Sequence, residues 1–351
     1  YKAQVIHNLG PPNSMKWQDW PLSYPKVGEV RLRHTAIGVN FADTYHRAGI
    51  SHPWPVSKPP VVIGFEGVGI IDEIGQDVKN FKIGDRVTVP FVCGCGTCGE
   101  CNSGNHQVCD YQSQPGFTHH GSFAEYVALD YADTNLVKLP ESISNVTAAT
   151  LGCRFITSFR AIVAQGKVSE GQHVVIHGCG GVGLSAIMIA KALGAQVTAI
   201  DINDETLTFA KELGASSTIH AATNTHVVSS IREITKGGAH VSLDALGSAT
   251  TCFNSISGLR KRGKHIQVGL MTGDHKHPKV PMDVILANEL EILGSHGMQA
   301  YKYPELFKMI HDGKLHPEKL IERTISLEES TKALPNMNKF EHKGVLVINS
   351  F

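Results

Sequence analysis

The sequence predicts a mixed α/β protein of two domains, in which a doubly wound parallel sheet follows a β-rich first part. Three observations lead to this fold class. The chain has 351 residues, which is enough for two separate cores. From residue 173 onward, apolar runs of strand length alternate with segments of helix length. Before that, residues 1–39 show short alternating runs broken by proline and glycine, as antiparallel sheets do.

The first 150 residues are expected to form mainly strands. Residues 61–74, 84–92 and 122–139 continue the strand character of residues 1–39. Two segments interrupt it. Residues 40–47 (NFADTYHR) lack the strand period and end before Gly49, so we expect a short helix there, and a second helix is expected over residues 144–150.

Five of the eight cysteines lie between residues 93 and 109. The spacing C-x2-C-x2-C-x7-C selects four of them, Cys95, Cys98, Cys101 and Cys109. Four thiolates close the tetrahedral shell of zinc and leave no open position, which is typical of a structural site. We therefore predict one structural zinc in a lobe over residues 93–110, with disulfides or free thiols as the alternatives. Cys93 is out of register and His106 is surplus, so neither is expected to be a ligand.

A glycine-rich turn follows the apolar run 173–177. Gly178, Gly180 and Gly183 have G-x-G-x-x-G spacing, with Gly181 and Val182 between them, and a helix is expected from 182 to 193. In such a turn the first glycine permits the tight bend, the second lets the backbone approach a pyrophosphate, and the third lets helix and strand pack closely. The helix N-terminus offers unpaired N–H groups to the phosphates. The stretch therefore predicts a dinucleotide-binding fold; a simple glycine-rich turn is the alternative.

Asp201 ends the next expected strand, residues 196–200. An acid at this position accepts hydrogen bonds from ribose hydroxyls and repels a 2′-phosphate. No lysine or arginine follows before Lys211 to offset that repulsion. The sequence thus favours NAD(H) over NADP(H), although Asp201 can also serve as the N-cap of the following helix.

The remaining α/β pattern completes the parallel sheet. Further strands are expected at 217–220, 240–246, 264–270 and 292–295, and further helices at 204–213, 225–235 and 249–259. The tail is expected to add one helix, 304–312, and a closing strand, 345–348, and to return to the first domain.

Charge and hydropathy exclude several classes of function. The chain has 32 basic and 32 acidic residues, and hence no net charge, which argues against nucleic acid as a partner. No apolar run reaches the length of a membrane span, and the first residues have no signal-peptide pattern. We expect a cytoplasmic protein that acts on a small molecule, with no membrane partner.

With these features the chain resembles the medium-chain dehydrogenase/reductase superfamily, which includes zinc alcohol dehydrogenases and quinone oxidoreductases. The resemblance rests on the Gly-Asp-Arg-Val turn at 84–87, the cysteine lobe, Cys153 followed by Thr157, the glycine turn with Asp201, and Val268-Gly269-Leu270. It implies a GroES-like catalytic domain (1–153 and 295–351), a Rossmann domain (154–294) and a cleft between them. It also implies that Thr157, Val268 and Leu270 lie near the nicotinamide. We expect a homo-oligomer, a dimer or a tetramer.

The resemblance is divided along the chain. From Cys95 on it is to the zinc alcohol dehydrogenases, whereas the stretches GVNFADTYHRAG and GFEG before residue 90 resemble quinone oxidoreductases. Alcohol dehydrogenases bind a catalytic zinc through a cysteine in the first stretch, a histidine in the second, and the cysteine that matches Cys153. Here Asn40 and Phe65 occupy the first two positions. The resemblance therefore implies that a catalytic zinc is absent; a substitute set of Cys153, Glu66 and Asp43, with His46 nearby, is the alternative.

The same stretches supply the expected catalytic residues: Asn40, Asp43, Tyr45, Glu66 and Cys153. Tyr45 resembles the active-site tyrosine of quinone oxidoreductases, whose phenol can polarise a carbonyl; a core tyrosine with a satisfied hydroxyl is the alternative. The Asn40 amide is a second possible donor. Glu66 and Asp43 can instead form buried pairs with Arg154 or Arg47, and Cys153 can be a small residue left in place.

Three functions remain open at this stage. The first is an NADH-dependent reductase of an enone or quinone that works without a catalytic metal. The second is a zinc alcohol dehydrogenase with an unusual ligand set. The third is a nucleotide-binding protein with a structural or sensing role and no catalysis.

Overall fold

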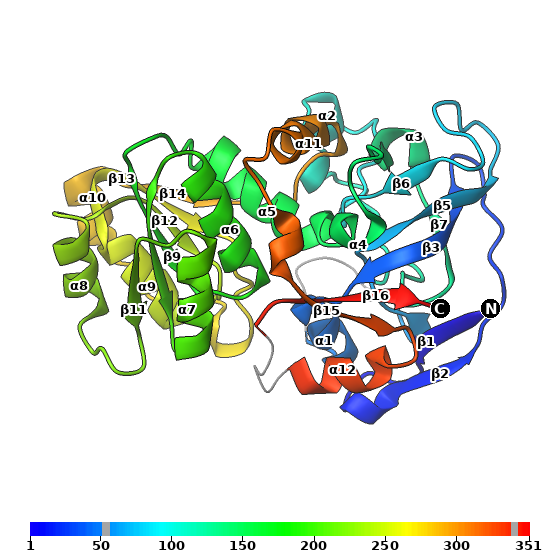
Figure 1. Cartoon of the computed structure of the whole chain (residues 1–351), viewed down its shortest axis with the longest axis horizontal. Helices are drawn as coiled ribbons and strands as arrows, with labels where there is room; N and C mark the ends of the chain where they lie inside the picture. Colours follow the sequence, from blue (N-terminus) through cyan, green and yellow to red (C-terminus); the bar gives the residue numbers. More distant parts are fainter. Residues whose placement is uncertain (51–56, 338–342) are drawn as a thin grey trace. The chain divides into compact units, whose positions relative to one another are not determined.

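The computed structural model describes residues 1–50, 57–337 and 343–351, and these form two compact units (Figure 1). Unit 1 comprises residues 1–156, 297–312 and 317–351, and unit 2 comprises residues 157–296 and 313–316. Within the described part of the chain, no helix combines the length and the hydropathy that a membrane crossing requires.

Unit 1 is built on two sheets. The larger has seven strands in the order β15-β16-β3-β5-β6-β8, with β7 paired to β3, and the smaller has the order β2-β1-β4. The strands of the larger sheet are β3 (Val30–Gly38), β5 (Gly67–Ile74), β6 (Arg86–Thr88), β7 (Tyr126–Leu129), β8 (Val137–Lys138), β15 (Ile321–Ser326) and β16 (Val345–Ser350). Those of the smaller sheet are β1 (Lys2–Ile6), β2 (Met15–Asp19) and β4 (Val61–Val62).

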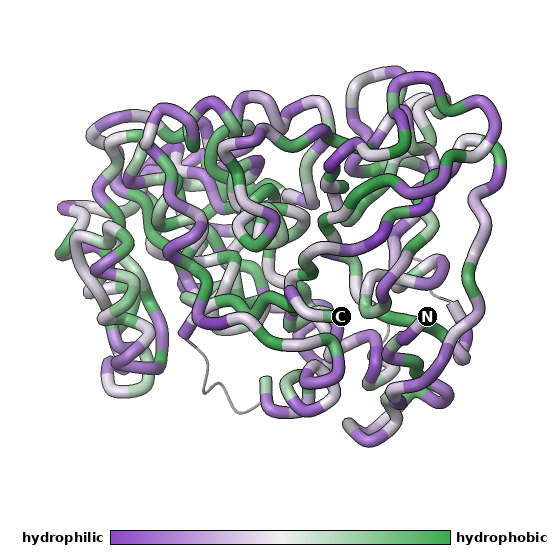
Figure 2. Tube along the Cα trace, turned by 45° about the vertical axis from the view of Figure 1, so that its right-hand side comes forward, coloured by the Kyte–Doolittle hydropathy of each residue, from purple (hydrophilic) through white to green (hydrophobic). Residues whose placement is uncertain are grey.

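Antiparallel pairing of distant segments fixes the core of unit 1. β3 pairs with β5 on one side and with β16 on the other, so the C-terminal strand closes a sheet that the N-terminal residues begin. Val30, Leu32 and Ile71 point into one core cluster and are fully buried. In Figure 2, hydrophobic stretches of the trace run through the interior of the units, and hydrophilic residues are frequent in the outer loops, as expected where burial of apolar area stabilises the fold.

The helices of unit 1 are short. Helix α1 (Phe41–Ala48) begins after Asn40, which is extended, and ends at Gly49 in the left-handed conformation, as predicted. The others are α2 (Gly99–Asn102), α3 (Ala132–Asn135), α4 (Asn145–Ala148), α11 (Tyr303–His311), α12 (Ser330–Asn336), the 3-10 turns η1 (Pro12–Ser14), η2 (His106–Val108), η6 (Ala300–Lys302) and η7 (Pro317–Leu320), and the π-helical turn η3 (Leu151–Phe155). Helix α5 (Ile156–Phe159) leads into unit 2.

Unit 2 is a doubly wound parallel sheet of six strands in the order β11-β10-β9-β12-β13-β14. The strands are β9 (His173–His177), β10 (Gln196–Asp201), β11 (Ser217–His220), β12 (Ala239–Asp244), β13 (Leu259–Gln267) and β14 (Glu291–Gly294). Its helices are the π-helical η4 (Arg160–Gln165), α6 (Gly181–Ala192), α7 (Asp204–Leu213), α8 (Val227–Ile234), α9 (Ala249–Ser257), α10 (Met282–Asn288) and the turn η5 (Gly273–His275). The order reverses between β9 and β12, and ligands of such sheets bind at that point.

The structure corrects several element predictions. The tail has a second strand and a second helix, β15 and α12, where only one of each was expected. The segment 122–139 contains the helix α3 between two short strands rather than continuous strand. Asn203, and not Asp201, caps α7: its side chain accepts a hydrogen bond from the Thr206 N–H at 3.0 Å.

Candidate active site

The cysteine lobe brings its four predicted ligands together. The sulfur atoms of Cys95, Cys98, Cys101 and Cys109 all lie within 4.8 Å of one another, and those of Cys98 and Cys109 are 3.7 Å apart. A tetrahedron with Zn–S bonds of about 2.3 Å has edges of about 3.8 Å, so the cluster fits a zinc ion. All eight cysteines are free thiols, which disagrees with the disulfide alternative.

Backbone N–H groups already point at these sulfurs. The Cys98 N–H donates to the Cys95 sulfur at 3.3 Å, and the Cys101 N–H donates to the Cys98 sulfur at 3.4 Å. Burial acts to raise the pKa of the Cys95 thiol, but hydrogen bonds from Thr97 and Cys98 outweigh it and lower that pKa to about 6. Such donors stabilise the thiolates that zinc requires.

A buried polar network in unit 1 joins three segments that are far apart in the sequence, around Asn40, Glu66 and Arg154. The Glu66 carboxylate is 1% exposed, and it accepts hydrogen bonds from the Asn40 amide at 2.7 Å and from the Arg154 guanidinium at 2.8 Å. Its second oxygen accepts the Cys153 N–H at 3.0 Å. Arg154 also donates to the Val39 carbonyl at 2.7 Å. The carboxylate is therefore neutralised and hydrogen-bonded by protein groups alone.

Two glycines leave the space that Glu66 occupies. A Cβ atom on Gly38 would come within 2.3 Å of both the Glu66 carboxylate and the Ala149 carbonyl. One on Gly152 would lie 2.9 Å from the Glu66 side chain. These two glycines could not be predicted from the sequence, because no neighbouring residue indicates that a distant side chain needs the space.

Asp43 lies beside this network and does not form an ion pair with Arg47 among the described contacts. Its Oδ2 accepts the Asn40 backbone N–H at 3.0 Å, while its Oδ1 is buried without a hydrogen-bond partner. Burial raises the pKa of Asp43 to about 8; the Glu66 charge adds to the shift and the Asn40 N–H opposes it. Near neutral pH this carboxyl group is therefore mainly protonated.

The donor set around Cys153 does not fit a catalytic zinc. Phe65 offers no ligand atom and packs in an aromatic cluster, with ring centroids 5.9 Å from Phe91 and 5.4 Å from Phe117. Both oxygens of Glu66 are already hydrogen-bonded. Burial, together with the Glu66 charge, raises the pKa of the Cys153 thiol well above its ordinary value. Among the described residues, the lobe cysteines are the one His/Cys/Asp/Glu cluster with convergent ligand atoms.

Tyr45 differs from Asn40 in that its polar group has no hydrogen-bond partner among the described residues. The ring is half-buried and makes an edge-to-face contact with Phe41 at 5.1 Å. Within the described residues the hydroxyl makes no hydrogen bond, and burial raises its pKa. Asn40, in contrast, is 2% exposed and its amide is bound to Glu66. Of the two predicted donors, Tyr45 is the one without a hydrogen-bond partner in the described part of the chain.

In unit 2 the glycine turn has the geometry that a pyrophosphate needs. Gly178 has a φ of 89°, which only glycine adopts readily. A Cβ on Gly183 would lie 1.8 Å from the Gly178 carbonyl oxygen, so turn and helix touch there. A Cβ on Gly180 would meet nothing within 4 Å, and no side chain caps the N-terminus of α6. The turn thus presents open space to a ligand. The backbone N–H groups of Gly181, Val182 and Gly183, at the start of α6, are available to bind it.

Asp201 closes the turn from the next strand. One of its carboxylate oxygens accepts the Cys179 N–H at 2.8 Å, and the other accepts the Ile202 N–H at 2.7 Å. These bonds hold the carboxylate at the end of β10, beside the glycine turn. This position is the one at which an acid meets the ribose in dinucleotide-binding folds.

A second acid that the sequence analysis missed, Asp244, organises the neighbouring loops. Its carboxylate accepts the N–H groups of Leu246 and Gly247 at 3.0 and 2.9 Å. Its carbonyl accepts the N–H groups of Val268 and Gly269 at 3.1 and 2.8 Å. The loop that carries Val268 and Leu270 is thereby fixed against the loop after β12, on the same edge of the sheet as the glycine turn.

Thr157 is also suited to bind a ligand in unit 2. It is 7% exposed, and its hydroxyl oxygen is buried without a hydrogen-bond partner. Because a buried unpaired hydroxyl is unfavourable, such a group is expected to bind another molecule.

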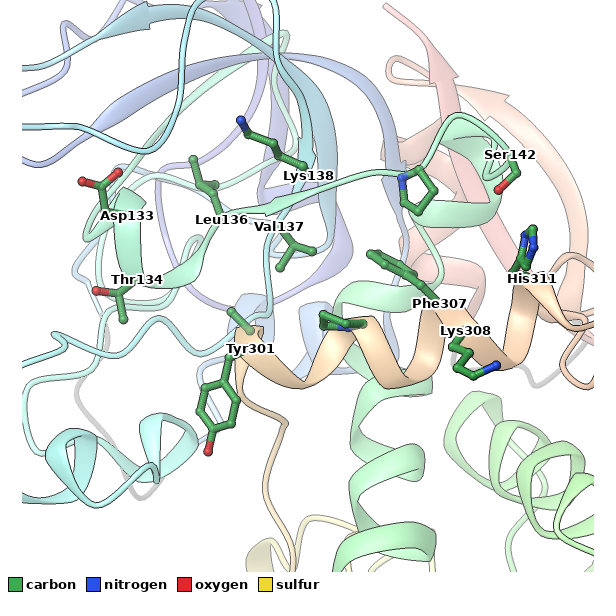
Figure 3. Close-up of a pocket in the computed structure, with 13 residues that line it drawn as sticks. Asp133, Thr134, Leu136, Val137, Lys138, Ser142, Tyr301, Phe307, Lys308 and His311 are labelled. Atoms are coloured by element: carbon green, nitrogen blue, oxygen red, sulfur yellow. The ribbon is translucent and has the colours of Figure 1, made fainter.

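Unit 1 contains a separate cavity of about 700 Å³ between α3, β8 and α11 (Figure 3). Phe307 and Val137 contribute apolar surface, and Asp133, Lys138 and Lys308 are polar members of the lining. None of the predicted catalytic residues lines it, so this cavity is distinct from the network around Glu66.

Comparison with known proteins places these features in context. The family model "Alcohol dehydrogenase GroES-like domain" matches residues 26–141, and "Zinc-binding dehydrogenase" matches residues 181–312. The NAD-dependent alcohol dehydrogenase of Sulfurisphaera tokodaii is 33% identical over 355 residues and 99% of each chain. The 2-haloacrylate reductase of a Burkholderia species is 31% identical over 359 residues, 99% of this chain and 98% of that one. The crystal structure of an NAD-dependent alcohol dehydrogenase superimposes with a TM-score of 0.89 at 28% identity, covering 100% of both chains.

Proposed function

The chain belongs to the medium-chain dehydrogenase/reductase superfamily of oxidoreductases, and we propose that it reduces an activated carbonyl compound, an enone or a quinone, with NADH and without a catalytic zinc. The observation that carries this proposal is the state of Glu66. Its two oxygens accept three protein hydrogen bonds, and Phe65 stands beside it in an aromatic cluster. A Lewis-acid metal would need ligands that these residues do not supply.

The reaction adds a hydride ion and a proton to the substrate, which together carry two electrons and two protons. NADH held at the glycine turn and Asp201 would supply the hydride and would be oxidised to NAD⁺. For an enone, the hydride forms a C–H bond at the β-carbon, the C=C π pair moves toward the carbonyl, and the resulting enolate takes a proton at its α-carbon. Negative charge develops on the carbonyl oxygen before that proton arrives, and a hydrogen-bond donor must stabilise it.

Tyr45 is the donor that this proposal assigns to the carbonyl oxygen, because its hydroxyl has no hydrogen-bond partner among the residues that the structure describes. Asn40 becomes a positioning residue that holds Glu66. Asp43 and Cys153, both protonated near neutral pH, keep further negative charge away from the developing enolate. Arg154 contributes the one buried positive charge of the network.

An activated substrate suits a site with one neutral donor. An enone or quinone delocalises the developing charge and needs less stabilisation than a simple ketone or aldehyde, for which a metal contributes several kcal/mol. The relative named 2-haloacrylate reductase supports this choice, because a 2-haloacrylate has a C=C bond conjugated to a carboxylate. The relatives named alcohol dehydrogenases favour a second candidate, the oxidation of an alcohol by NAD⁺.

A substrate panel separates these candidates. We expect NADH consumption with cyclic enones and quinones at rates at least about a hundredfold above those for simple alcohols with NAD⁺, a difference of about 2.7 kcal/mol in activation free energy. Faster oxidation of primary or secondary alcohols would establish the alcohol dehydrogenase instead. Cofactor binding without turnover on the whole panel would establish a silent nucleotide-binding protein.

The preference for NAD(H) rests on Asp201. Its carboxylate repels a 2′-phosphate, and Asp201→Ser removes that charge while keeping a hydrogen-bonding group. We expect the ratio of NADPH to NADH affinity, measured by quenching of protein fluorescence, to rise by about tenfold in this variant. Asp204→Ser, three residues further on and exposed, is the matched control and should leave the ratio unchanged. Tighter binding of NADPH than NADH by the unmodified chain would contradict the assignment.

A further inference from the structure

Unit 2 contains a strongly basic pocket at the N-terminal ends of its strands, whereas the glycine turn lies at their C-terminal ends. Its lining comes from the residues before β9 and from the N-terminal ends of β12 and β13. These strands are parallel, and the glycine turn follows the C-terminal end of β9. A five-residue strand spans about 16 Å, so the basic pocket and the glycine turn are separate sites.

Five cationic side chains line this pocket, which has a volume of about 110 Å³: Lys167, Arg260, Lys261, Arg262 and Lys264. The whole chain has no net charge, so this is a local concentration of positive charge. Among the described residues, one acid forms an ion pair with it: Glu289 lies 3.2 Å from Arg262, and both side chains are more than 70% exposed. Such an exposed pair contributes little. Glu291 is beside Lys264 in the strand register without an ion pair between them.

His240 holds the Arg260 guanidinium in the pocket. Arg260 Nη1 lies 2.7 Å from His240 Nε2, and Arg260 Nε donates to the Gly238 carbonyl at 3.1 Å. The other ring nitrogen of His240, Nδ1, lies 2.9 Å from the His173 backbone nitrogen. Burial, together with the charge of Arg260, lowers the pKa of His240, so the positive charge of this pair is that of Arg260.

We propose that this pocket binds a phosphate-type oxyanion, either free phosphate or the phosphate of a small phosphomonoester. The pocket volume equals the volume that roughly three to four molecules occupy in liquid water. It is enough for a tetrahedral oxyanion and far too small for a dinucleotide. Arginine and lysine donors give charge-assisted hydrogen bonds to such a group. Gly166 and Gly263 complete the lining and are buried. The proposal does not depend on the reaction proposed above.

Titration of the full-length protein with inorganic phosphate at constant ionic strength tests this site. The readout is the set of backbone amide resonances, which reports residues 166–167 and 260–264 separately from the glycine turn at 178–183. We expect saturable shifts at the basic pocket. Lys261→Gln combined with Lys264→Gln should weaken that binding by about tenfold or more. Lys276→Gln combined with Lys279→Gln removes the same charge from exposed positions elsewhere in unit 2 and should leave it within about twofold.

The resonances of residues 178–183 serve as the internal control for folding, since the Lys261/Lys264 variant should leave them unchanged. A parallel titration with glycerol 3-phosphate identifies the source: tighter binding assigns a phosphomonoester, and equal or weaker binding assigns free phosphate. No saturable shift at 166–167 and 260–264 would overturn the proposal. Equal losses in the two lysine variants would also overturn it, because they would indicate general screening rather than a site.

Discussion

At the scale of single residues, the active-site account depends on which polar groups the protein already satisfies. Glu66, Asn40 and Arg154 satisfy one another, whereas the hydroxyls of Tyr45 and Thr157 have no protein partner among the described residues. A group bound within the protein positions others, and a group without a partner is available to a ligand. This distinction separates Tyr45 from Asn40, which the sequence alone placed together.

Tyr45→Phe tests the donor role directly. Removing the hydroxyl leaves the ring contact with Phe41 in place and deletes one hydrogen bond to the developing oxyanion. We expect kcat with an enone to fall by about 10²–10³, the usual effect of losing one oxyanion donor, with the NADH dissociation constant unchanged. Thr44→Val, on the same helix and buried, is the control for general damage to α1. An unchanged kcat in Tyr45→Phe would remove Tyr45 from the mechanism.

Asp43 makes stability depend on pH in a defined direction. Because burial raises its pKa from 3.8 to about 8, the folded state holds one more proton than the unfolded state between those values. The free energy of unfolding therefore falls as pH rises through this window, by up to about 1.4 kcal/mol per pH unit. Asp43→Asn keeps the oxygen acceptor and has no proton to lose, so its urea midpoint should fall less steeply between pH 5 and 8. Parallel pH profiles of the two proteins would contradict the assignment.

At the scale of elements, motifs whose residues lie close together in the sequence could be predicted, whereas contacts between distant segments could not. The cysteine lobe and the glycine turn could be predicted because their residues lie within a few positions of one another and the chemistry fixes the spacing. The Glu66 network could not, because Asn40 and Arg154 are 26 and 88 residues from Glu66 and meet only through the fold. Arg154 was named as a possible partner, but Gly38 and Gly152 were not.

The lengths of short elements could not be predicted, for a different reason. The predicted strand segments 84–92 and 122–139 do contain β6 and β8, but these strands have only three and two residues, which is too short for a period to mark their ends. Helix α12 contains Pro335, an unfavourable residue inside a helix, and its buried residues Ala333 and Leu334 pack in the same core cluster as β16. Tertiary packing therefore stabilises a helix that propensity argues against.

Two glycines of one turn should respond differently to the same substitution. Gly180→Ala adds a methyl group into open space, so stability should be unchanged while NADH affinity falls by roughly tenfold, since the methyl group keeps the pyrophosphate from the backbone. Gly183→Ala forces a contact with the Gly178 carbonyl, so the melting temperature should fall as well. Melting curves with and without NADH measure both effects. Equal loss of stability in the two variants would contradict this division of roles.

At the scale of the whole molecule, each unit carries a different part of the proposed chemistry. Unit 1 holds the cysteine lobe and the network around Glu66, and unit 2 holds the glycine turn and Asp201. The sequence predicted two domains with these separate sites, because the strand-rich pattern changes near residue 173 to alternating strands and helices. It also identified Asn40 and Phe65 as the two residues that distinguish the chain from the zinc alcohol dehydrogenases. Only the structure shows that both oxygens of the neighbouring Glu66 are hydrogen-bonded.

The central claim is that the protein holds a zinc in the lobe and uses none in catalysis. The measurement that tests it most directly is the zinc content per chain together with the rate of NADH-dependent enone reduction, before and after brief treatment with a chelator. We expect one zinc per chain, held by the lobe cysteines, and a rate that is unchanged while that zinc remains bound. Two zinc ions per chain, with activity lost when the second is removed and restored when it is returned, would contradict it.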